Sequence, residues 1–304
     1  MNDSKRHIRQ IPLIGSSGQA KLKSSHVVIV GIGALGSVAA ELLVRSGVGQ
    51  LTLIDRDLIE LSNLQRQALF VEKDVSRSKV LAAKEHLLEI DSSIDIEIHA
   101  AHLDKKNIAS IIPSSVDLLL DCTDTMAVRW LLNDYARKNT LPWIFSSVVA
   151  SSGLIRFVSV ESPCLKCHFP KNAKGATCAE AGVLAMSSHV IGSMQANLAL
   201  RFLIDDLDLA SFYDTLFSIN LKEMEIQKFK VKGNKNCECC KRNFESLCVD
   251  NGANEEIVRF CSSGQYQIYK NRSVDLKKLS LVVKNDFEQV LLDEVCLRFG
   301  PVTV

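Results

Sequence analysis

The sequence lacks the features that assign a protein to a membrane or to export. No apolar run approaches the length of a membrane span, and the first residues, MNDSKRHIRQIPLIG, lack the apolar core of a signal peptide. An excess of one charge is lacking too, because 36 basic and 35 acidic residues leave a net charge of +1. This balance points to neither nucleic acid nor a membrane surface. We therefore expect a cytoplasmic globular protein that binds neither.

Internal repeats and low-complexity segments are also absent, and the seven histidines show no triad-like placement. A mechanism built on a catalytic histidine is therefore not expected. The chain has 304 residues, 47% of them hydrophobic. That is enough for one large domain or two unequal ones.

Cysteine, in contrast, is abundant, with ten residues. Without an export signal these thiols should stay reduced, so their clustering favours metal binding or catalysis over disulfides. Two C-x-x-C pairs lie about seventy residues apart, which suits a closed, structural Cys₄ zinc site. The expected ligands are Cys164, Cys167, Cys237 and Cys240. Cys239 competes with Cys240 within CECC, and reduced loop thiols or a redox pair are the alternatives to zinc.

Strands and helices alternate over the first 150 residues. Short β-branched or apolar runs predict strands at 26–31, 51–55, 94–100, 116–122 and 142–149. Apolar residues at helical spacing predict helices at 34–46, 77–90 and 126–139, and Gly47 is placed to end the first of these. This alternation predicts an α/β fold with a parallel sheet and helices on both of its faces.

The pattern changes after residue 150. GLIRFVSV predicts an antiparallel extension of the sheet, residues 181–205 a long helix, and TLFSIN with MEIQKFKV a hairpin. The last 55 or so residues predict a separate small α/β module with strands at YQIY and EVCLRFG around a helix in VDLKKLSLVV. We therefore expect one domain over residues 1–248 and a module over 249–304, which stops abruptly at FGPVTV and is expected to be incomplete.

GIGALG follows the first strand and opens the first helix. Its glycines, Gly31, Gly33 and Gly36, permit a tight turn and let the backbone approach phosphate groups at a helix N-terminus. Asp55 ends the second strand about twenty residues later, as a ribose-binding acid does. The pattern indicates a bound nucleotide but does not say which one. The alternative is a glycine turn that holds no ligand.

A short polar run after Asp55 contains Asn63, Gln65 and Arg66. A hydride-transfer enzyme has little use for such a group, whereas an ATP-using enzyme needs fixed donors for the departing pyrophosphate. Arg66 offers a planar fork for phosphate oxygens, and Lys79 adds a second positive charge. The alternatives are that both are solvated charges, or that the chain is a nicotinamide-dependent oxidoreductase, which leaves SNLQRQ unexplained.

Taken together, GIGALGS, LIDRDLIELSNLQRQ, SKV, DCTD, TCAEAGVLA, IGSMQA and the two C-x-x-C pairs resemble the MoeB/ThiF family over about residues 5–248. The resemblance implies a Rossmann-like, mostly parallel α/β sheet with an antiparallel extension, stapled by zinc, within an ATP-binding adenylyltransferase domain at residues 1–248. It also implies a nucleotidyltransferase that activates ubiquitin-like sulfur-carrier proteins of the ThiS or MoaD type.

The resemblance further implies roles for individual residues. MgATP would lie on Gly31–Gly36, with Asp55 on the ribose. Asn63 and Arg66 would contact the phosphates, with Lys79 beside them, and Gln65 would be a further nucleotide contact. Asp124 in DCTD resembles the family's magnesium-associated aspartate, and its alternative is an N-cap of helix 126–139, a job that Thr123 or Thr125 could share. Thr125 stands where the family usually has Asn, and it is expected to make a secondary contact.

Two further residues owe their roles to the resemblance. RHIRQ is similar to the family's R-Y-x-R-Q segment, so Arg9 would reach the ATP of a partner subunit in a homodimer. Taken alone, the sequence describes Arg9 as a mobile terminal charge. Cys178 resembles the cysteine that ThiF-like enzymes use in sulfur transfer, for which a donor such as a cysteine desulfurase would be needed. An ordinary loop thiol is the alternative.

The expected reaction is the ATP-dependent adenylation of the carrier's C-terminal glycine carboxylate, with release of pyrophosphate, for thiamine or molybdopterin synthesis. The carboxylate is ionised at neutral pH and needs no general base. Adenylation of another target, such as a peptide or a tRNA base carboxylate, is the alternative within the resemblance. An inactive binding partner of an activating enzyme is the non-enzymatic alternative.

Overall fold

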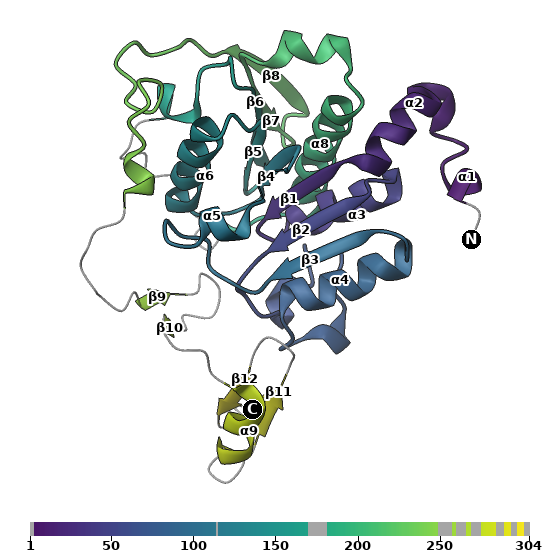
Figure 1. The fold of residues 1–304 in the computed structure, drawn as a ribbon, viewed down its shortest axis with the longest axis vertical. Coiled ribbons are helices and arrows are strands. Elements are labelled where there is room, and N and C mark those ends of the chain that lie inside the picture. Colours follow the sequence, from purple (N-terminus) through teal and green to yellow (C-terminus); the bar gives the residue numbers. More distant parts are fainter. Residues whose placement is uncertain are drawn as a thin grey trace.

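The computed structural model describes residues 3–113, 115–169 and 181–248, and the short segments 257–259, 266–268, 275–283, 289–292 and 297–300. One sheet has eight strands in the order β3-β2-β1-β4-β5-β6-β7-β8 (Figure 1). Their bounds are β1 His26–Val30, β2 Gln50–Ile54, β3 Asp95–His99, β4 Leu118–Asp121, β5 Trp143–Val149, β6 Ser152–Val158, β7 Thr215–Asn220 and β8 Glu225–Lys230.

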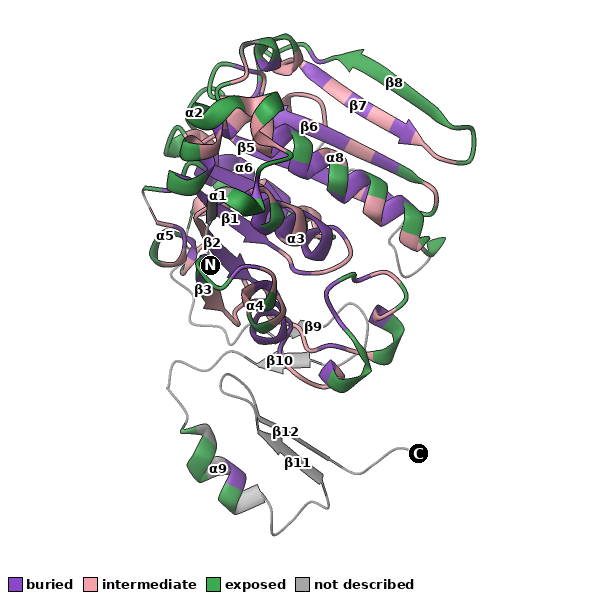
Figure 2. Ribbon diagram, turned by 90° about the vertical axis from the view of Figure 1, so that its right-hand side faces the viewer, coloured by how far each residue is buried: buried purple, intermediate pink, exposed green. Residues whose placement is uncertain are grey.

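The strand pairing in the sheet changes from parallel to antiparallel after β5. Strands β3, β2, β1, β4 and β5 pair in parallel, whereas β6, β7 and β8 continue the sheet in antiparallel pairing. Strand β8 forms one edge and is exposed along its whole length (Figure 2). The parallel sheet with an antiparallel extension and the hairpin are therefore confirmed.

Helices cover both faces of the sheet, as the alternation predicted. They are α2 Ile11–Ser24, α3 Gly36–Ser46, α4 Lys79–Ile90, α5 Ile108–Ile111, α6 Met126–Lys138 and α8 Ala185–Leu203. Strand β1 separates two cores, because alternate side chains point to opposite faces. Val27 and Ile29 pack in a core with residues of α2, α3, α4 and α8, and Val28 and Val30 pack in another with residues of α5 and α6.

The N-terminal segment contains a helix that the sequence pattern did not predict. Helix α2 is kinked at Gly15, whose φ is 71°, so its apolar residues do not follow one helical period. The preceding residues, which include the short α1 Asp3–Arg6, are anchored rather than mobile. Gln10 Nε2 donates to the carbonyl of Ser46 at 2.9 Å, and His7 is buried against Gly47. Gly47 ends α3 in the left-handed conformation, as predicted.

The long helix begins four residues later than expected. Residues 182–184 run alongside Ala150 instead, since the Ala150 amide donates to Gly182 and the Leu184 amide donates to Ala150. Gly182 has a φ of 72°, which a helix does not accommodate. The predicted helix at 181–205 was therefore too long at its start, because this pairing is not visible in the local sequence.

Smaller elements occupy the C-terminal part of the chain. Strands β9 Ile257–Arg259 and β10 Tyr266–Ile268 pair, as do β11 Gln289–Leu292 and β12 Leu297–Gly300, and α9 Leu276–Val283 contacts the latter pair. The expected strands and helix of this region are present, while the division into domains 1–248 and 249–304 stays a prediction. Among the described residues, no helix is both long and apolar enough to cross a membrane.

Candidate active site and metal centre

The glycine loop lies at the carboxyl edge of the parallel strands, where ligands bind in such sheets. Gly31 has a φ of 90°, and a Cβ there would lie 2.8 Å from the carbonyl oxygen of Cys122. A Cβ on Gly36 would lie 1.9 Å from the carbonyl oxygen of Gly31. Both positions therefore require glycine. A Cβ on Gly33, in contrast, would meet only the Gln67 side chain, at 3.8 Å.

Asp55 fixes this loop from the end of β2. Its carboxylate accepts the backbone N–H of Ile32 at 2.7 Å and that of Asp57 at 2.8 Å. Burial, together with the nearby charge of Asp57, raises the pKa of Asp55, and Lys79 opposes that rise. The acid expected at the ribose is thus joined to the glycine loop by a direct hydrogen bond.

Lys79 is not a solvated helix charge. Its side chain is buried, and its Nζ lies 3.0 Å from Oδ2 of Asp57. Burial opposes its positive charge, but Asp55, Asp57 and Asp124 outweigh that effect and raise its pKa. The site therefore contains a fixed, charged ammonium group among three carboxylates. Sequence reasoning passed over Asp57, although its position two residues after Asp55 was a usable signal.

The predicted contact residues in the polar run after β2 differ in their burial and in their hydrogen-bond partners. Asn63 is buried and its Oδ1 accepts the Glu60 amide at 3.2 Å, so it caps the short 3₁₀ turn at Leu61–Asn63. Gln65 is exposed, and its amide donates to the Val183 carbonyl at 3.4 Å. Arg66 Nη1 donates to the carbonyl of Ser62 at 2.8 Å.

Among the described residues, Arg66 has no carboxylate partner. Its guanidinium group therefore keeps donors for an anion. Gln67, which the candidate set left out, is buried beside Gly33, and its Oε1 has no hydrogen-bond partner in the described part of the chain. A buried, unsatisfied amide oxygen beside the glycine loop is a second feature that suits a bound polar ligand.

Asp124 lies where the sequence places it, just beyond β4. It is exposed, and the N-cap position of α6 belongs to Thr125, without a hydrogen bond from its side chain. The interpretation of Asp124 as the helix cap is therefore wrong. Its charge contributes to the raised pKa of Lys79. Asp124 thus lies close enough to Lys79 to act on its charge, and its carboxylate has no partner among the described residues.

A buried ion pair holds the loop that carries Asp124. Asp121 accepts the N–H of Thr123 at 3.0 Å and its hydroxyl at 2.7 Å. Arg129 Nε lies 3.3 Å from Asp121, and its Nη2 donates to the Thr123 carbonyl at 2.5 Å. Sequence reasoning missed this pair. The signals were an acid that closes an apolar strand and an arginine on the buried face of α6.

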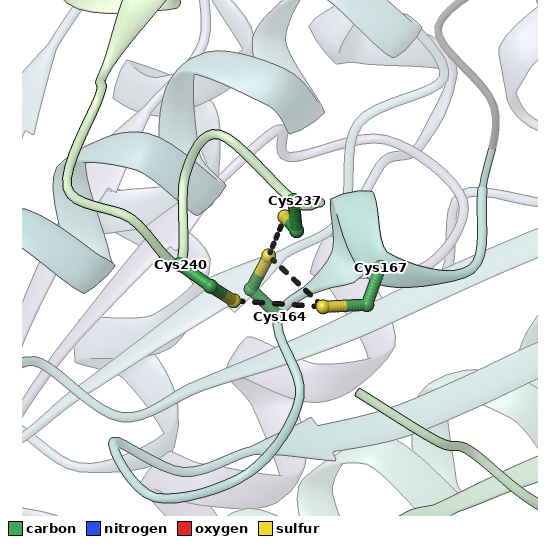
Figure 3. A group of neighbouring side chains, drawn as sticks. All are labelled: Cys164, Cys167, Cys237 and Cys240. Carbon is green, nitrogen blue, oxygen red and sulfur yellow. Dashed lines mark hydrogen bonds between the residues drawn. The ribbon is translucent and has the colours of Figure 1, made fainter. Parts of the chain in front are cut away.

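The four cysteines of the two C-x-x-C pairs come together in one group (Figure 3). Cys164 Sγ lies 3.9 Å from Cys167 Sγ and 3.5 Å from Cys237 Sγ, and Cys167 Sγ lies 3.5 Å from Cys240 Sγ. All four sulfur atoms lie within 4.8 Å of one another. Four thiolates around a zinc ion at about 2.3 Å are about 3.8 Å apart, so this group fits such an ion.

The cluster also decides between the neighbouring cysteines of CECC. Cys240 belongs to the four-thiol group, whereas Cys239 is buried and its sulfur accepts the Asn133 amide at 3.2 Å. Hydrogen bonding to Cys164 and burial raise the pKa of Cys167 to about 12. Four thiols this close cannot share negative charge without a cation, which a metal ion supplies.

With this geometry in view, the comparison with known proteins decides the family: residues 4–241 match the ThiF family. The chain belongs to the ThiF family. It is 39% identical to the molybdopterin-synthase adenylyltransferase of Escherichia coli K12, over 77% of this chain and 95% of that protein. It is 32% identical to the sulfur carrier protein ThiS adenylyltransferase of Bacillus subtilis, over 88% of this chain and 80% of that protein.

A solved structure of E. coli MccB with ATP has the same fold, with a TM-score of 0.69 and 23% identity over 79% of this chain and 75% of that chain. The family match and the adenylyltransferases among its relatives identify this ThiF-family protein as an adenylyltransferase. The nicotinamide-dependent oxidoreductase is therefore wrong, as is the inactive binding partner.

One predicted site residue of this ThiF-family chain, Arg9, lies away from the glycine loop. Arg9 is exposed and directly precedes Gln10, whose side chain donates to the carbonyl of Ser46, the last residue of α3. The glycine loop lies at the other end of α3, whose 11 residues span about 16 Å. Arg9 is thus separated from its own glycine loop. Cys178 lies in residues 170–180, outside the described residues.

Proposed function

We propose that this protein activates the C-terminal glycine carboxylate of a ubiquitin-like sulfur-carrier protein, for thiamine or molybdopterin synthesis. The observation that carries the proposal is the cationic edge beside the glycine loop. There Lys79 is buried and charged, and Arg66 has no carboxylate partner in the described part of the chain. The names of the E. coli and B. subtilis relatives support the choice of target.

The reaction joins a carrier carboxylate oxygen to the α-phosphorus of ATP and breaks the bond between that phosphorus and the pyrophosphate oxygen. The carboxylate attacks in its ionised form, so no residue has to remove a proton. Asp55 holds the ribose while it fixes the Ile32 amide of the phosphate loop. Lys79 and Arg66 compensate the charge that develops on the leaving pyrophosphate, with contacts from Gln65 and Asn63.

Asp124, with Thr125 as a secondary contact, is the proposed holder of Mg²⁺. Its carboxylate is exposed, and among the described residues no hydrogen bond or ion pair occupies it. When bound there, the ion would neutralise part of the negative charge of the phosphate groups. Asp57 pairs with Lys79 and raises the pKa of its ammonium group, so it helps to keep Lys79 charged.

The four-cysteine cluster is the proposed site of a structural zinc ion. Cys164 and Cys167 follow β6, and Cys237 and Cys240 follow β8. Zinc bound by four thiolates has no open position, so its role is to join these two segments rather than to take part in the reaction. Cys178 is the proposed sulfur-transfer residue, and a donor such as a cysteine desulfurase would supply the sulfur.

A homodimer with shared sites completes the proposal. The placement of Arg9 at the end of α3 away from its own glycine loop supports its use in the site of a partner subunit. Such sharing requires the symmetric pairing that two-fold oligomers provide.

The test is pyrophosphate exchange with ATP, magnesium and a panel of carriers that end in Gly-Gly. Arg66→Ala and Asp124→Ala should each lower the exchange rate by about 100-fold or more, because each removes a charged contact to the reacting phosphates. Arg45→Ala is the matched control, since Arg45 pairs with Glu41 on α3 and makes no contact with the site.

Exchange at the parental rate in both site variants would overturn the site assignment. Activity with a peptide or a tRNA base carboxylate, and none with any carrier, would replace the proposed target and leave the adenylation chemistry in place.

A further inference from the structure

Two arginines lie beside the cysteine cluster, and within the described residues neither forms an ion pair with a carboxylate. Arg156, on β6, is fully buried at 0% exposure. Its Nη1 donates to the Cys164 carbonyl at 3.5 Å, its Nη2 donates to the Pro163 carbonyl, and its Nε has no partner in the described part of the chain. Asp214 acts on the charge of Arg156 without forming an ion pair with it. A buried charge with no directly paired counter-ion is costly, so its retention calls for an explanation.

Arg137 contacts the cluster from a different element, helix α6. Its Nη2 lies 3.5 Å from the Cys240 sulfur and donates to the Ser162 carbonyl at 2.9 Å. Its Nη1 donates to the Val160 carbonyl. The only partner of Arg137 that can carry negative charge, among the described residues, is therefore a cysteine of the cluster.

The charge of a loaded cluster supplies the missing counter-ion. A divalent ion bound by four thiolates leaves two excess negative charges, and the two guanidinium groups balance them. Lys166 is a third cation nearby, but Asp134 already binds its Nζ at 2.7 Å. Among the described residues, Arg137 and Arg156 are the cations that hydrogen-bond to cysteines of the cluster and form no ion pair with a carboxylate.

We propose that Arg137 and Arg156 are the counter-ions of a tetrathiolate metal site and set its affinity for the divalent ion, a role that rests on the metal site of the proposed function. Each arginine contacts one C-x-x-C pair. Arg156 fixes the backbone of the first pair through the Cys164 carbonyl, and Arg137 contacts the second pair at Cys240. They act as positioning residues and take no part in adenylation.

The experiment measures Zn²⁺ affinity of the full chain by competition with a chromophoric chelator under reducing conditions. Arg137→Gln and Arg156→Gln should each bind Zn²⁺ about 10- to 100-fold more weakly, the usual effect of removing a partner of a metal ligand. Arg137→Lys should stay close to the parental affinity because it keeps the charge. Arg45→Gln, which removes an arginine far from the cluster, should match the parent.

Ionic strength separates charge compensation from a purely structural role. Arg137 is partly exposed, so added salt should narrow the difference between Arg137→Gln and the parent. The buried Arg156 should respond less. A structural defect would not depend on salt in this graded way.

The outcomes distinguish the two proposals. A parent chain that binds no Zn²⁺ would overturn the metal site itself. Zn²⁺ binding with parental affinity in both glutamine variants would overturn the counter-ion role and leave the metal site standing. If Arg156→Gln fails to fold, Arg137→Gln and Arg137→Lys decide: equal affinity in these two variants would contradict the proposal.

Discussion

At the scale of single residues, the site depends on charged groups that a folded core would normally exclude. Asp121 and Arg129 are both buried, and Arg129 stacks on the Phe145 ring with 5.2 Å to its centroid. Asp121 accepts hydrogen bonds from the amide and the hydroxyl of Thr123, and Arg129 donates to the Thr123 carbonyl. The pair therefore costs desolvation but fixes the loop that presents Asp124.

Removing one member of this pair should reveal that cost. Arg129→Met leaves the Asp121 carboxylate buried and unpaired, so the free energy of unfolding should fall by about 3–5 kcal/mol in a denaturant titration at neutral pH. Arg201→Met is the control, because Arg201 pairs with the partly exposed Asp206 and should cost about 1 kcal/mol or less. Equal losses in the two variants would contradict the special role of the buried pair.

The pH dependence of the same variant follows from Asp121. Burial raises the pKa of Asp121 above its usual 3.8, and Arg129 opposes that rise. Without Arg129 the folded-state pKa should rise further. An acid with a raised pKa favours the folded state fully below its unfolded pKa and loses that effect as the pH rises through the folded value. The stability deficit of Arg129→Met should therefore shrink from pH 7 to pH 5, and a deficit that grows would refute this reasoning.

At the scale of elements, helix α8 links the sheet to the phosphate-loop helix. Gln195 donates to the carbonyls of Asp121 at 3.0 Å and Ile144 at 3.2 Å, which ties α8 to the carboxyl edge of β4 and to β5. Gly192 allows α8 to approach α3 closely, since a Cβ there would lie 2.9 Å from Val38 Cβ and 3.1 Å from the Leu35 carbonyl. The position of α3, and so of its N-terminal loop, depends on this contact.

Gly192→Ala tests the contact. Alanine gains about 1 kcal/mol in helix propensity, but overpacking against Val38 costs about 1–3 kcal/mol, so we expect no gain or a net loss of up to about 2 kcal/mol. Ser193→Ala, at an exposed position of the same helix, should change stability by less than about 0.5 kcal/mol. Thermal melting of both variants gives the comparison, and stabilisation by Gly192→Ala would show that the helices have room to spare.

Element prediction succeeded where the pattern is local. The helix over α6 was predicted to within a residue of its end, because its apolar face repeats at helical spacing and is interrupted by nothing. Helix α2 was missed because Gly15 breaks its period, and α8 was begun too early because Ala150 pairs with residues 182–184. Both errors arise where a distant segment or a kink overrides local propensity.

At the scale of the whole molecule, the proposed dimer determines whether the site is complete. Arg9 is anchored at one end of α3 and the glycine loop lies at the other. The site of a single chain would therefore lack Arg9, whereas a symmetric pair would supply it to each site.

Mixing two inactive variants tests this sharing. In co-expressed Arg9→Ala and Asp124→Ala chains, about half of the dimers are mixed, and each mixed dimer restores one of two sites. Pyrophosphate exchange should then recover to roughly a quarter of the parental rate, although each variant alone is inactive. The same mixture without exchange would place Arg9 and Asp124 in one chain's site. Exchange at the parental rate by Arg9→Ala alone would remove Arg9 from the mechanism.

The sequence by itself determined the features that depend on short stretches of chain. These are the strand and glycine loop at residues 26–36, the acid at Asp55, the alternation of strands and helices, and the spacing of each C-x-x-C pair. Each follows from local backbone geometry or ligand spacing. A single sequence is therefore enough to predict them.

Only the tertiary structure decided which distant groups meet. It buried Lys79 among three carboxylates, selected Cys240 over Cys239, and placed Arg137 and Arg156 beside the thiols. These contacts join residues from different elements, and their energies come from burial and from charges brought close together. The pattern of one segment contains no information about what packs against it, so these features of the site emerge only when the chain is folded.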